Sequence, residues 1–597
     1  MSDRSQLIET GKPFAFDAQR DAEFERLATR YPTRESLILP SLWLVQEQEG
    51  WISAEAMAYI ADRIGTYASM VYEAATFYTM YNLQPKGKVH ICVCRTLSCY
   101  LLGKQEIVDY LQRELGIKPG EVSADSQYSL EEVECLGHCG TAPVVQINGE
   151  FYENMNVEKL KDLLATLILG ERRIMQVQVL SARFDIPDAH RIEVAKEHGA
   201  YATLEKVFSM QPEEVIETVK ASGLRGRGGA GFPTGLKWSF LPKGLDKPVY
   251  LAVNSDESEP ATFKDRYILV RDPHLLIEGI IICCYAIKSH AAYIYIRGEY
   301  TTQVKALQAA IDEAYAAGYL GESVGGRDFK LDVTVHRGAG AYVCGEETAL
   351  LESIEGRKGQ PRSKPPFPAV EGLYGCPTII NNVQSIASLP FILTNGPDAY
   401  KAYGTEKSPG THLFGISGLV KKPGMYELPL GLPILEVIDK VAGGLRDGRT
   451  LKGIIPGGSS TPVLTPEEAQ DVTLDYESMA AHKTMFGSGG IVVLDDTVDM
   501  VKLVENLISF YHHESCGQCT PCREGLGWML KIVKKILRGE GTTADIDLLT
   551  ELCDNIEGKT VCVLSAACTM STRSYLNKFR HEFEAYVHSG APVQAAM

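Results

Sequence analysis

Eight of the fifteen cysteines stand in two groups that have the spacing of metal ligands, and a ninth, Cys92, lies next to the first group in sequence. The second group is a Cys-x2-Cys-x2-Cys run with a fourth cysteine forty residues later: Cys516, Cys519, Cys522 and Cys562. Such a run with one remote thiolate is typical of a [4Fe-4S] cluster, whereas zinc ligands are usually paired more evenly. Cys553 and Cys568 are alternative fourth ligands, but both fall in predicted helix interiors. The sequence therefore favours Cys562.

The first group has wider spacing. It consists of a Cys-x4-Cys pair and a Cys-x3-Cys pair: Cys94 with Cys99, and Cys135 with Cys139. Four thiolates in two pairs suit either zinc or a [2Fe-2S] cluster, and structural zinc usually takes shorter gaps. The spacing therefore favours [2Fe-2S]. Cys92 is interpreted as a strand-facing bystander.

A glycine-rich stretch at 223–240 predicts an anion-binding loop. Glycine allows the backbone to approach a ligand closely, and successive amides can hold a phosphate, with Lys237 adding positive charge. The alternative is a flexible linker, but linkers rarely carry aromatic residues such as Phe232, Trp238 and Phe240 beside their glycines. The stretch follows a predicted helix over 212–221, whereas the glycine fingerprint of an ordinary Rossmann unit follows a strand.

Further polar loops follow predicted strands, at the strand ends where α/β sheets bind ligands. The first, 254–262, brings Asp256, Glu257 and Glu259, which we expect to hydrogen-bond ribityl or ribose hydroxyls. A glycine-rich turn at 338–350 also follows a predicted strand, and a proline-fixed loop at 359–368 and the segment 379–382 come after it in the chain.

The elements that must position these residues divide the chain into several units. They are a helical bundle (1–85), a thioredoxin-like β-α-β-β-α domain (86–170), a surface linker (171–210), a Rossmann-like domain (211–400), a ubiquitin-like β-grasp domain (410–490) and a helical bundle with the second cysteine group (495–597). The predicted fold class is thus multidomain α/β. In the thioredoxin-like unit, Asn148-Gly149 predicts a hairpin turn and 157–169 a closing helix.

Composition excludes several classes of protein. The net charge of −17 over 597 residues argues against a nucleic-acid binder, which needs a basic face. The N-terminus has no apolar signal region, and the most apolar run, 275–287, is too short to cross a bilayer. We expect a cytoplasmic protein in a reducing compartment that reaches a membrane only through partner subunits.

The assembled motifs resemble a known family. Residues 212–590 resemble the NADH- and FMN-binding flavoprotein subunit of respiratory complex I, on the glycine-rich stretch, Gly345-Glu-Glu-Thr348 and Cys516-Gly-Gln-Cys519. Residues 13–170 resemble its thioredoxin-like [2Fe-2S] partner subunit, here fused ahead of it. Related diaphorase subunits serve NAD-linked hydrogenases and formate dehydrogenases.

The resemblance implies FMN, NAD(H), one [4Fe-4S] and one [2Fe-2S] cluster as cofactors, and it assigns residues to them. The cluster ligands would be the two cysteine sets above. FMN would be bound by Gly226, Arg227, Gly228, Lys237, Asn254, Asp256, Glu257, Tyr342, Gly345, Glu346, Asn381 and Asn382. NADH would stack between Phe232, Phe240 and Phe367, with Glu259, Glu347 and Lys364 contacting its polar parts. Of these, Glu259 and Glu347 are expected to act in catalysis.

The implied function is NADH dehydrogenase. Hydride would pass from NADH to FMN and single electrons onward to the clusters, within the peripheral arm of a complex I-type enzyme. The same module serving a hydrogenase, a formate dehydrogenase or a bifurcating complex is the alternative, and a zinc-binding scaffold is a rival from another class. The chain departs from the family at Ser255, at Ala261 in place of glycine, and at Cys568-Thr569.

Overall fold

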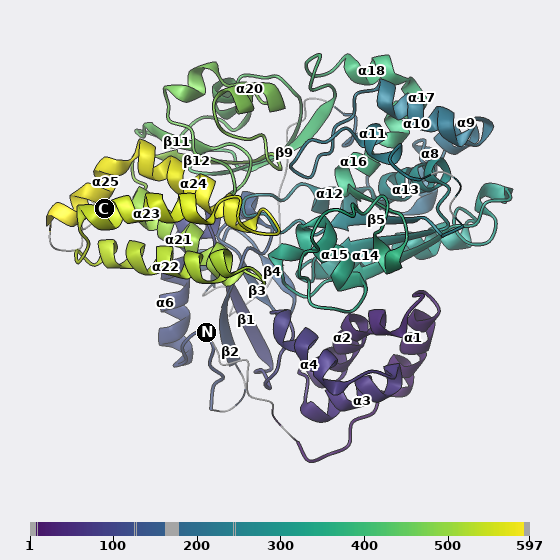
Figure 1. The fold of residues 1–597 in the computed structure, drawn as a ribbon, viewed down its shortest axis with the longest axis horizontal. Coiled ribbons are helices and arrows are strands. Elements are labelled where there is room, and N and C mark those ends of the chain that lie inside the picture. Colours follow the sequence, from purple (N-terminus) through teal and green to yellow (C-terminus); the bar gives the residue numbers. More distant parts are fainter. Residues whose placement is uncertain are drawn as a thin grey trace.

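The computed structural model describes residues 8–589 except 9, 125, 127, 161–177, 243 and 245. Within these residues the chain forms three four-stranded sheets surrounded by helices (Figure 1). No helix in the described part of the chain is long and apolar enough to cross a membrane.

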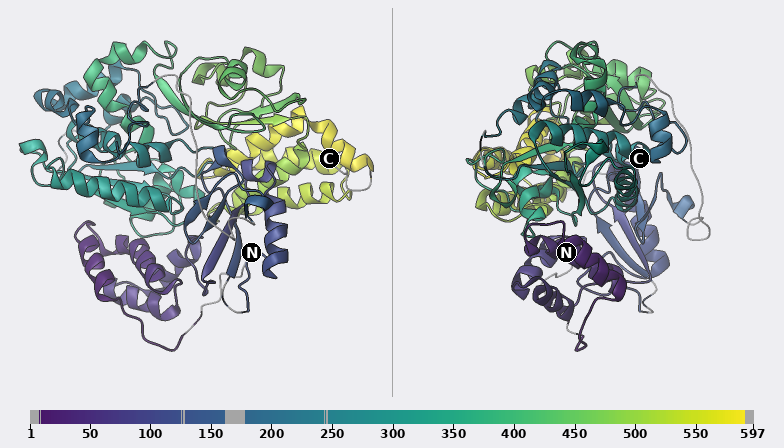
Figure 2. Two further views of the ribbon diagram at one scale, coloured as in Figure 1. Left: turned by 180° about the vertical axis from the view of Figure 1, so that it is seen from behind. Right: turned by 90° about the vertical axis from the view of Figure 1, so that its right-hand side faces the viewer.

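The first unit is helical, as expected. Its helices are α1 (Ala18–Ala28), α2 (Ile38–Glu49), α3 (Ala54–Ile64) and α4 (Ala68–Phe77). Helix α3 begins where the Ser53 side chain accepts the N–H of Ala56 and ends at Gly65, which has a φ of 82°. The bundle packs directly on the domain that carries the glycine loop (Figures 1 and 2), where the Trp43 indole N–H donates to the Gly338 carbonyl over 3.1 Å.

The thioredoxin-like unit has a sheet of order β2-β1-β3-β4, in which β1 and β2 are parallel. Its elements are β1 (Val89–Cys94), α5 (Ser98–Leu101), α6 (Lys104–Leu115), β2 (Tyr128–Val133), β3 (Val145–Ile147) and β4 (Glu150–Tyr152). The β3–β4 hairpin turns at Asn148 and Gly149, both with positive φ, as the dipeptide predicts. Most of the expected closing helix lies outside the described residues.

The prediction of a linker over 171–210 is wrong for the described part, 178–210. This part contains α8 (Ile192–Glu197) and α9 (Thr203–Ser209), and its apolar side chains, among them Leu180, Phe184 and Leu204, are buried in the core of the next domain. Glu427 fixes its start by accepting the N–H groups of Leu180 and Ser181 over 2.9 Å each. The apolar residues are too irregularly spaced to show a helical period in the sequence.

The central domain is built on a parallel sheet of order β7-β6-β5-β8. The strands are β5 (Tyr250–Ser255), β6 (Ala291–Ile296), β7 (Asp332–Arg337) and β8 (Thr378–Asn382). The helices are α10 (Pro212–Ala221), α11 (Thr234–Trp238), α12 (Asp265–Arg271), α13 (Pro273–Ile287), α14 (Thr301–Ala316), α15 (Glu347–Ile354), α16 (Val383–Ala387), α17 (Leu389–Asn395) and α18 (Pro397–Lys401). Because the strands are parallel, the loops that follow β5 and β8 emerge at one edge of the sheet.

Two further units complete the chain. A mixed sheet of order β10-β9-β12-β11 comprises β9 (Thr411–Gly418), β10 (Gly424–Pro429), β11 (Leu451–Ile455) and β12 (Gly490–Asp495), with helices α19 (Ile434–Glu436) and α20 (Tyr476–Ala481). The last helices are α21 (Met500–His513), α22 (Thr520–Leu537), α23 (Thr543–Ile556), α24 (Leu564–Lys578) and α25 (Arg580–Ser589). They lie beside β11 and β12 in Figure 1.

Candidate functional site

The glycine loop lies at the edge of the parallel sheet where β5 and β8 end. Asn254 and Asn382 are register partners on those strands. The loop closes on itself, since the Gly226 N–H donates to the Phe232 carbonyl over 2.8 Å, and a Cβ added at Gly228 would lie 3.1 Å from the Cβ of Asn382. Gly228 therefore lets the loop lie against the strand end.

Several predicted ligands already have partners within the fold. The Arg227 guanidinium is fully buried and donates to the Pro409 carbonyl over 2.7 Å. The Asn381 side chain accepts the Trp238 indole N–H over 2.9 Å, and the Asn382 oxygen caps α16. The side-chain oxygens of Asn381 and Asn382 are thus used within the fold, whereas Nε and Nη1 of Arg227 are buried without a hydrogen-bond partner.

Glu257 is placed differently from our expectation. One carboxylate oxygen accepts the N–H groups of Lys264 and Asp265 over 2.8 Å each, and the other accepts the Tyr300 hydroxyl over 2.7 Å. The carboxylate thus holds the first turn of α12. Its hydrogen-bonding capacity is used within the fold rather than offered to a ligand.

Asp256 and Asn254 face the turn after β7. The Asn254 amide donates to the Gly345 carbonyl over 2.8 Å. Asp256 Oδ1 accepts the Ser258 hydroxyl, while Oδ2 is buried without a hydrogen-bond partner. Burial raises the pKa of Asp256 to about 7, although the Arg297 guanidinium opposes the shift.

Two lysines and two glutamates form a charged group across the glycine loop and the proline loop. Lys364 Nζ lies 2.9 Å from Glu346 and 2.7 Å from Glu347, and Lys237 Nζ lies 3.1 Å from the other oxygen of Glu347. Burial raises the pKa of Glu347, but Lys237 and Lys364 more than offset this and lower it. Glu346 also caps α15 by accepting the Thr348 N–H over 2.8 Å.

Three aromatic side chains on the neighbouring loops remain exposed. Phe232, Phe240 and Phe367 have exposed fractions of 46%, 52% and 59%. Phe232 and Phe240 lie 6.0 Å apart between ring centroids, with an angle of 49° between their planes. Large exposed apolar rings beside a charged group are the arrangement expected for a surface that stacks a planar ligand.

Glu259 is half-buried and is held by Tyr342 together with two residues that the sequence did not indicate, Ser459 and Ser460. Its carboxylate accepts the Tyr342 hydroxyl over 2.5 Å, the Ser460 N–H over 2.8 Å and the Ser459 hydroxyl over 3.2 Å. Burial raises the pKa of Glu259, although these donors oppose the shift.

The β-rich unit after residue 410 therefore forms one wall of the site. It supplies Ser459 and Ser460, and also Tyr476, whose hydroxyl donates to the Gly226 carbonyl over 2.9 Å. Sequence analysis missed these residues. The one available signal was the Pro456-Gly-Gly-Ser-Ser460 turn, in which a Cβ at Gly458 would lie 2.6 Å from the Glu259 side chain.

The second cysteine group gathers around the loop between α21 and α22. The Cys519 Sγ accepts the Val561 N–H over 3.4 Å, which places the segment of Cys562 against this loop. Burial and then the thiols of Cys516 and Cys522 raise the pKa of Cys562 to about 12. Cys553 and Cys568 are fully buried within α23 and α24.

The first cysteine group is buried at the boundary with the central domain. Cys94, Cys99, Cys135 and Cys139 are each at most 3% exposed, and the Sγ atoms of Cys135 and Cys139 lie 3.5 Å apart. The Ala261 N–H donates to the Cys139 Sγ over 3.3 Å, and Arg266 donates to the Gly137 carbonyl over 3.1 Å.

Ala261, at the end of the Glu259 loop, has a φ of 79°. This is the left-handed conformation that the family's glycine would adopt without strain. The departure noted in the sequence thus marks a strained position, and it lies at the contact with the first cysteine group.

Comparison with known proteins identifies the family. The F 2 subunit of the NADH-quinone oxidoreductase of Rhizobium meliloti is 51% identical over 410 residues, which cover 68% of this chain and 97% of that protein. The F subunit of the NADH-quinone oxidoreductase of Streptomyces coelicolor is 51% identical over 419 residues, covering 70% of this chain and 93% of that protein. The chain belongs to the family of NADH-quinone oxidoreductase F subunits. The resemblance drawn from the glycine loop and the cysteines is confirmed.

Family profiles divide this member of the F-subunit family into regions. They match a thioredoxin-like [2Fe-2S] ferredoxin at 24–168, a Nuo51 FMN-binding domain at 219–390, an SLBB domain at 412–493 and a NADH-ubiquinone oxidoreductase-F iron-sulfur binding region at 502–586. A solved NAD+-reducing [NiFe]-hydrogenase chain, described as air-oxidized, matches with a TM-score of 0.81 at 29% identity, over 93% of this chain and 95% of that one. The mixed α/β multidomain fold is therefore shared along nearly the whole length.

The residues of this family member fit the cofactors of these profiles. The unpartnered Asp256 Oδ2 and the close approach of Gly228 to Asn382 suit a polar ligand lying over the glycine loop. Two sets of four thiols suit two iron–sulfur clusters.

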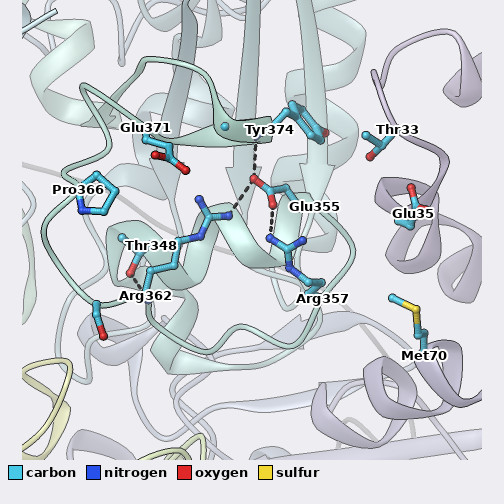
Figure 3. A pocket seen from close by; sticks show the side chains of 12 residues that line it. Thr33, Glu35, Met70, Thr348, Glu355, Arg357, Arg362, Pro366, Glu371 and Tyr374 are labelled. Atoms are coloured by element: carbon cyan, nitrogen blue, oxygen red, sulfur yellow. Dashed lines mark hydrogen bonds and ion pairs between the residues drawn. The ribbon is translucent and has the colours of Figure 1, made fainter.

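A cavity of about 720 Å³ lies between the N-terminal bundle and the proline loop (Figure 3). None of the predicted site residues lines it. Glu355 accepts the Arg362 guanidinium over 2.8 Å, pairs with Arg357, and accepts the Tyr374 N–H over 2.8 Å. Glu355, Arg357 and Arg362 are thus already paired with one another, and the cavity lies behind the loop that carries Lys364 and Phe367.

Proposed function

We propose that this chain oxidises NADH and feeds its electrons into a complex I-type oxidoreductase. The observation that carries the proposal is the meeting of three features at one sheet edge: the glycine loop, the Lys237–Glu347–Lys364 group and the exposed aromatic rings. Both thiolate sets lie on the same chain, so an electron path can begin and continue within it. The named relatives are NADH-quinone oxidoreductase subunits.

FMN, when bound, would accept a hydride from NADH and release its electrons one at a time. The loop of Gly226, Arg227 and Gly228 would lie along its phosphate, with the backbone amide of Gly228 and the ammonium of Lys237 offered to it, since the amides of Gly226 and Arg227 donate within the fold. Asn254 and Asp256 would bind its polar chain, with Gly345, Asn381 and Asn382 shaping the pocket around the ring. Tyr342 would lie beside the ring and keep Glu259 in place.

The nucleotide would stack on Phe232, Phe240 and Phe367. Lys364 and Glu347 would contact its polar groups, and Glu259, aligned by Tyr342 and Ser460, would orient its reacting end. Cys516, Cys519, Cys522 and Cys562 would hold the [4Fe-4S] cluster. Cys94, Cys99, Cys135 and Cys139 would hold the [2Fe-2S] cluster.

The finer organisation belongs to the same proposal. The units at 1–85, 86–170, 211–400, 410–490 and 495–597 would be the helical bundle, the [2Fe-2S] domain, the FMN and NADH domain, the β-grasp domain and the [4Fe-4S] bundle. The protein would be cytoplasmic and reach the membrane through its partner subunits in the peripheral arm.

A single variant tests the route of the electrons. In Cys516→Ser, NADH should still bleach the flavin absorption in anaerobic stopped-flow at nearly the rate of the wild type, because hydride transfer needs no cluster. Reduction of the native partner subunits should be lost. Partner reduction at the wild-type rate would overturn the proposal, and Cys553→Ser, a buried cysteine within α23, is the matched control.

A second host complex is supported by the hydrogenase comparison, which covers the N-terminal units as well. The same module would then serve an NAD-linked hydrogenase, and related formate dehydrogenase and bifurcating complexes remain in this class. Purification of the native complex and identification of its subunits distinguishes these hosts from a quinone-reducing one.

A further inference from the structure

Cys92 lies in a cluster of metal-binding side chains outside the two cysteine groups. It was interpreted from the sequence as a bystander, but the structure places His90 and Glu131 next to it. His90 and Cys92 are two residues apart on β1 and so share one face of the sheet. Glu131 lies opposite Cys92 on the parallel strand β2.

Two of the distances between the ligand atoms are close to those of a tetrahedral zinc site. His90 Nε2 lies 3.2 Å from Cys92 Sγ and 3.7 Å from Glu131 Oε2, and all three atoms lie within 4.8 Å of one another. Zinc bond lengths with tetrahedral angles require about 3.6 Å between sulfur and nitrogen and about 3.4 Å between nitrogen and oxygen. Both observed distances are within about 0.4 Å of these values, so small side-chain rotations would close the site.

A second layer of contacts orients the histidine. His90 Nδ1 lies 2.8 Å from the Ser129 hydroxyl, and that hydroxyl oxygen also accepts the Gly87 N–H over 3.1 Å. Ligating histidines commonly donate their other ring nitrogen in this way, which leaves Nε2 free for the metal.

Charge and access are compatible with a divalent cation. Lys86 pairs with Glu131 Oε1, and Oε2 of the same carboxylate lies 3.7 Å from His90 Nε2. The His90 and Glu131 side chains are 20% and 28% exposed, so one side of the cluster is open to water as a fourth ligand.

We propose that His90, Cys92 and Glu131 form a site for one borderline-soft divalent cation, such as zinc. An imidazole, a thiolate and a carboxylate are a donor set that suits zinc. The site is separate from the first cysteine group. Cys94 lies two residues further along β1 and packs with Cys99 and Leu136.

The test uses the full chain with its flavin and clusters. The protein is dialysed against a chelator, supplied with one equivalent of zinc sulfate and desalted, and zinc and iron are then measured by mass spectrometry. The wild type should retain one zinc per chain, and Cys92→Ala and Glu131→Gln should fall to background with unchanged iron. Cys284→Ala, which removes an equally buried thiol on α13, should retain zinc. Ser129→Ala should weaken binding about tenfold in competition with a chelator of known zinc affinity.

Zinc X-ray absorption keeps the proposal falsifiable if a variant misfolds, because it needs the wild type alone. We expect one sulfur at about 2.3 Å and the remaining ligands nitrogen or oxygen at about 2.0 to 2.2 Å. Two or more sulfurs would place the ion in a vacant cluster site and overturn the proposal. The proposal would also be overturned if the ion had no sulfur ligand, if the wild type bound no zinc, or if Cys92→Ala retained its full zinc.

Discussion

The backbone N–H of Ala261 donates a hydrogen bond to the Sγ of Cys139 over 3.3 Å. This contact joins the loop that carries Glu259 to a predicted thiolate of the [2Fe-2S] cluster. Hydrogen bonds to cluster sulfurs are one of the means by which proteins set reduction potentials. The geometry depends on Ala261 keeping a φ of 79°.

Two substitutions at Ala261 should distinguish the effect of the backbone conformation at this position from the effect of side-chain size. Ala261→Gly should keep the cluster signal and the thermal stability, because glycine adopts this φ freely. Ala261→Val should lower the free energy of unfolding by about 2 kcal/mol, because a β-branched residue is a severe outlier there. Thermal unfolding and the electron paramagnetic resonance signal of the [2Fe-2S] cluster would measure both effects. Equal behaviour of the two variants would contradict the strain argument.

The fourth ligand of the [4Fe-4S] cluster can be settled directly. Cys562→Ala should remove that cluster, whereas Cys568→Ala should keep it, because Cys568 is enclosed within α24. Iron content and the paramagnetic signal of the reduced protein are the measurements. Loss of the cluster from Cys568→Ala with full occupancy in Cys562→Ala would reverse the assignment.

The [2Fe-2S] cluster should be removable without loss of NADH oxidation. Cys135→Ser should abolish one paramagnetic signal while NADH oxidation by an artificial acceptor continues. The physical reason is that Arg297 donates to the backbone carbonyl of Cys135, so the loop stays anchored when the thiol is lost.

Arg297→Ala is the contrasting variant. It removes a buried guanidinium that also donates to the Glu257 carbonyl over 2.6 Å, and it should destabilise the protein by about 3 kcal/mol. If Cys135→Ser lost flavin and activity together, the two units would be inseparable.

The nucleotide preference should depend on Glu347. Its lowered pKa keeps the carboxylate charged at neutral pH, and a 2′-phosphate would add about 1.5 to 2 negative charges nearby. Because Lys237 and Lys364 screen it, we expect about a ten- to hundredfold preference for NADH over NADPH in kcat/KM.

Glu347→Gln should raise kcat/KM for NADPH and narrow the preference about tenfold, with NADH changed little. Glu197→Gln, which alters an exposed carboxylate on α8, should leave the ratio unchanged. Equal use of both nucleotides by the wild type would refute the idea.

Asp256 should make the FMN-free protein less stable as the pH rises. Its pKa increases from an ordinary value of 3.8 to about 7 in the folded state, so the folded state holds an extra proton between these values. Stability from this group is therefore present below about pH 4 and lost by about pH 7, on the order of 4 kcal/mol in all.

Melting temperatures measured from pH 4 to 8 would test this expected loss of stability with rising pH. In Asp256→Asn the melting temperature should fall less steeply as the pH rises. Asp398→Asn, at a fully exposed aspartate, should leave the slope unchanged. An unaltered slope in Asp256→Asn would show that another group is responsible.

Local patterns predicted most of the elements and both thiolate sets. The Asn148-Gly149 turn and the helix over 212–221 depend on neighbours in sequence, and the structure confirms them. Contacts between distant segments were not predictable. Glu257 was expected at FMN because nothing local shows that α12 needs a cap, and Tyr476 was missed because it reaches Gly226 from another unit. The position of Glu131 opposite Cys92 was likewise not predictable, because the two residues are distant in sequence.

The docking of the N-terminal units on the central domain takes place within one polypeptide. Trp43, Arg266 and Arg297 make contacts that, in a version split into two chains, would have to overcome the entropy of association. When two units are joined in one chain, each meets the other at an effective concentration instead, which is about millimolar for short flexible connections. The two cluster sites are consequently present in equal numbers at every protein concentration. A substitution in this contact that would dissociate separate subunits will here shift only an intramolecular equilibrium, which dilution cannot change.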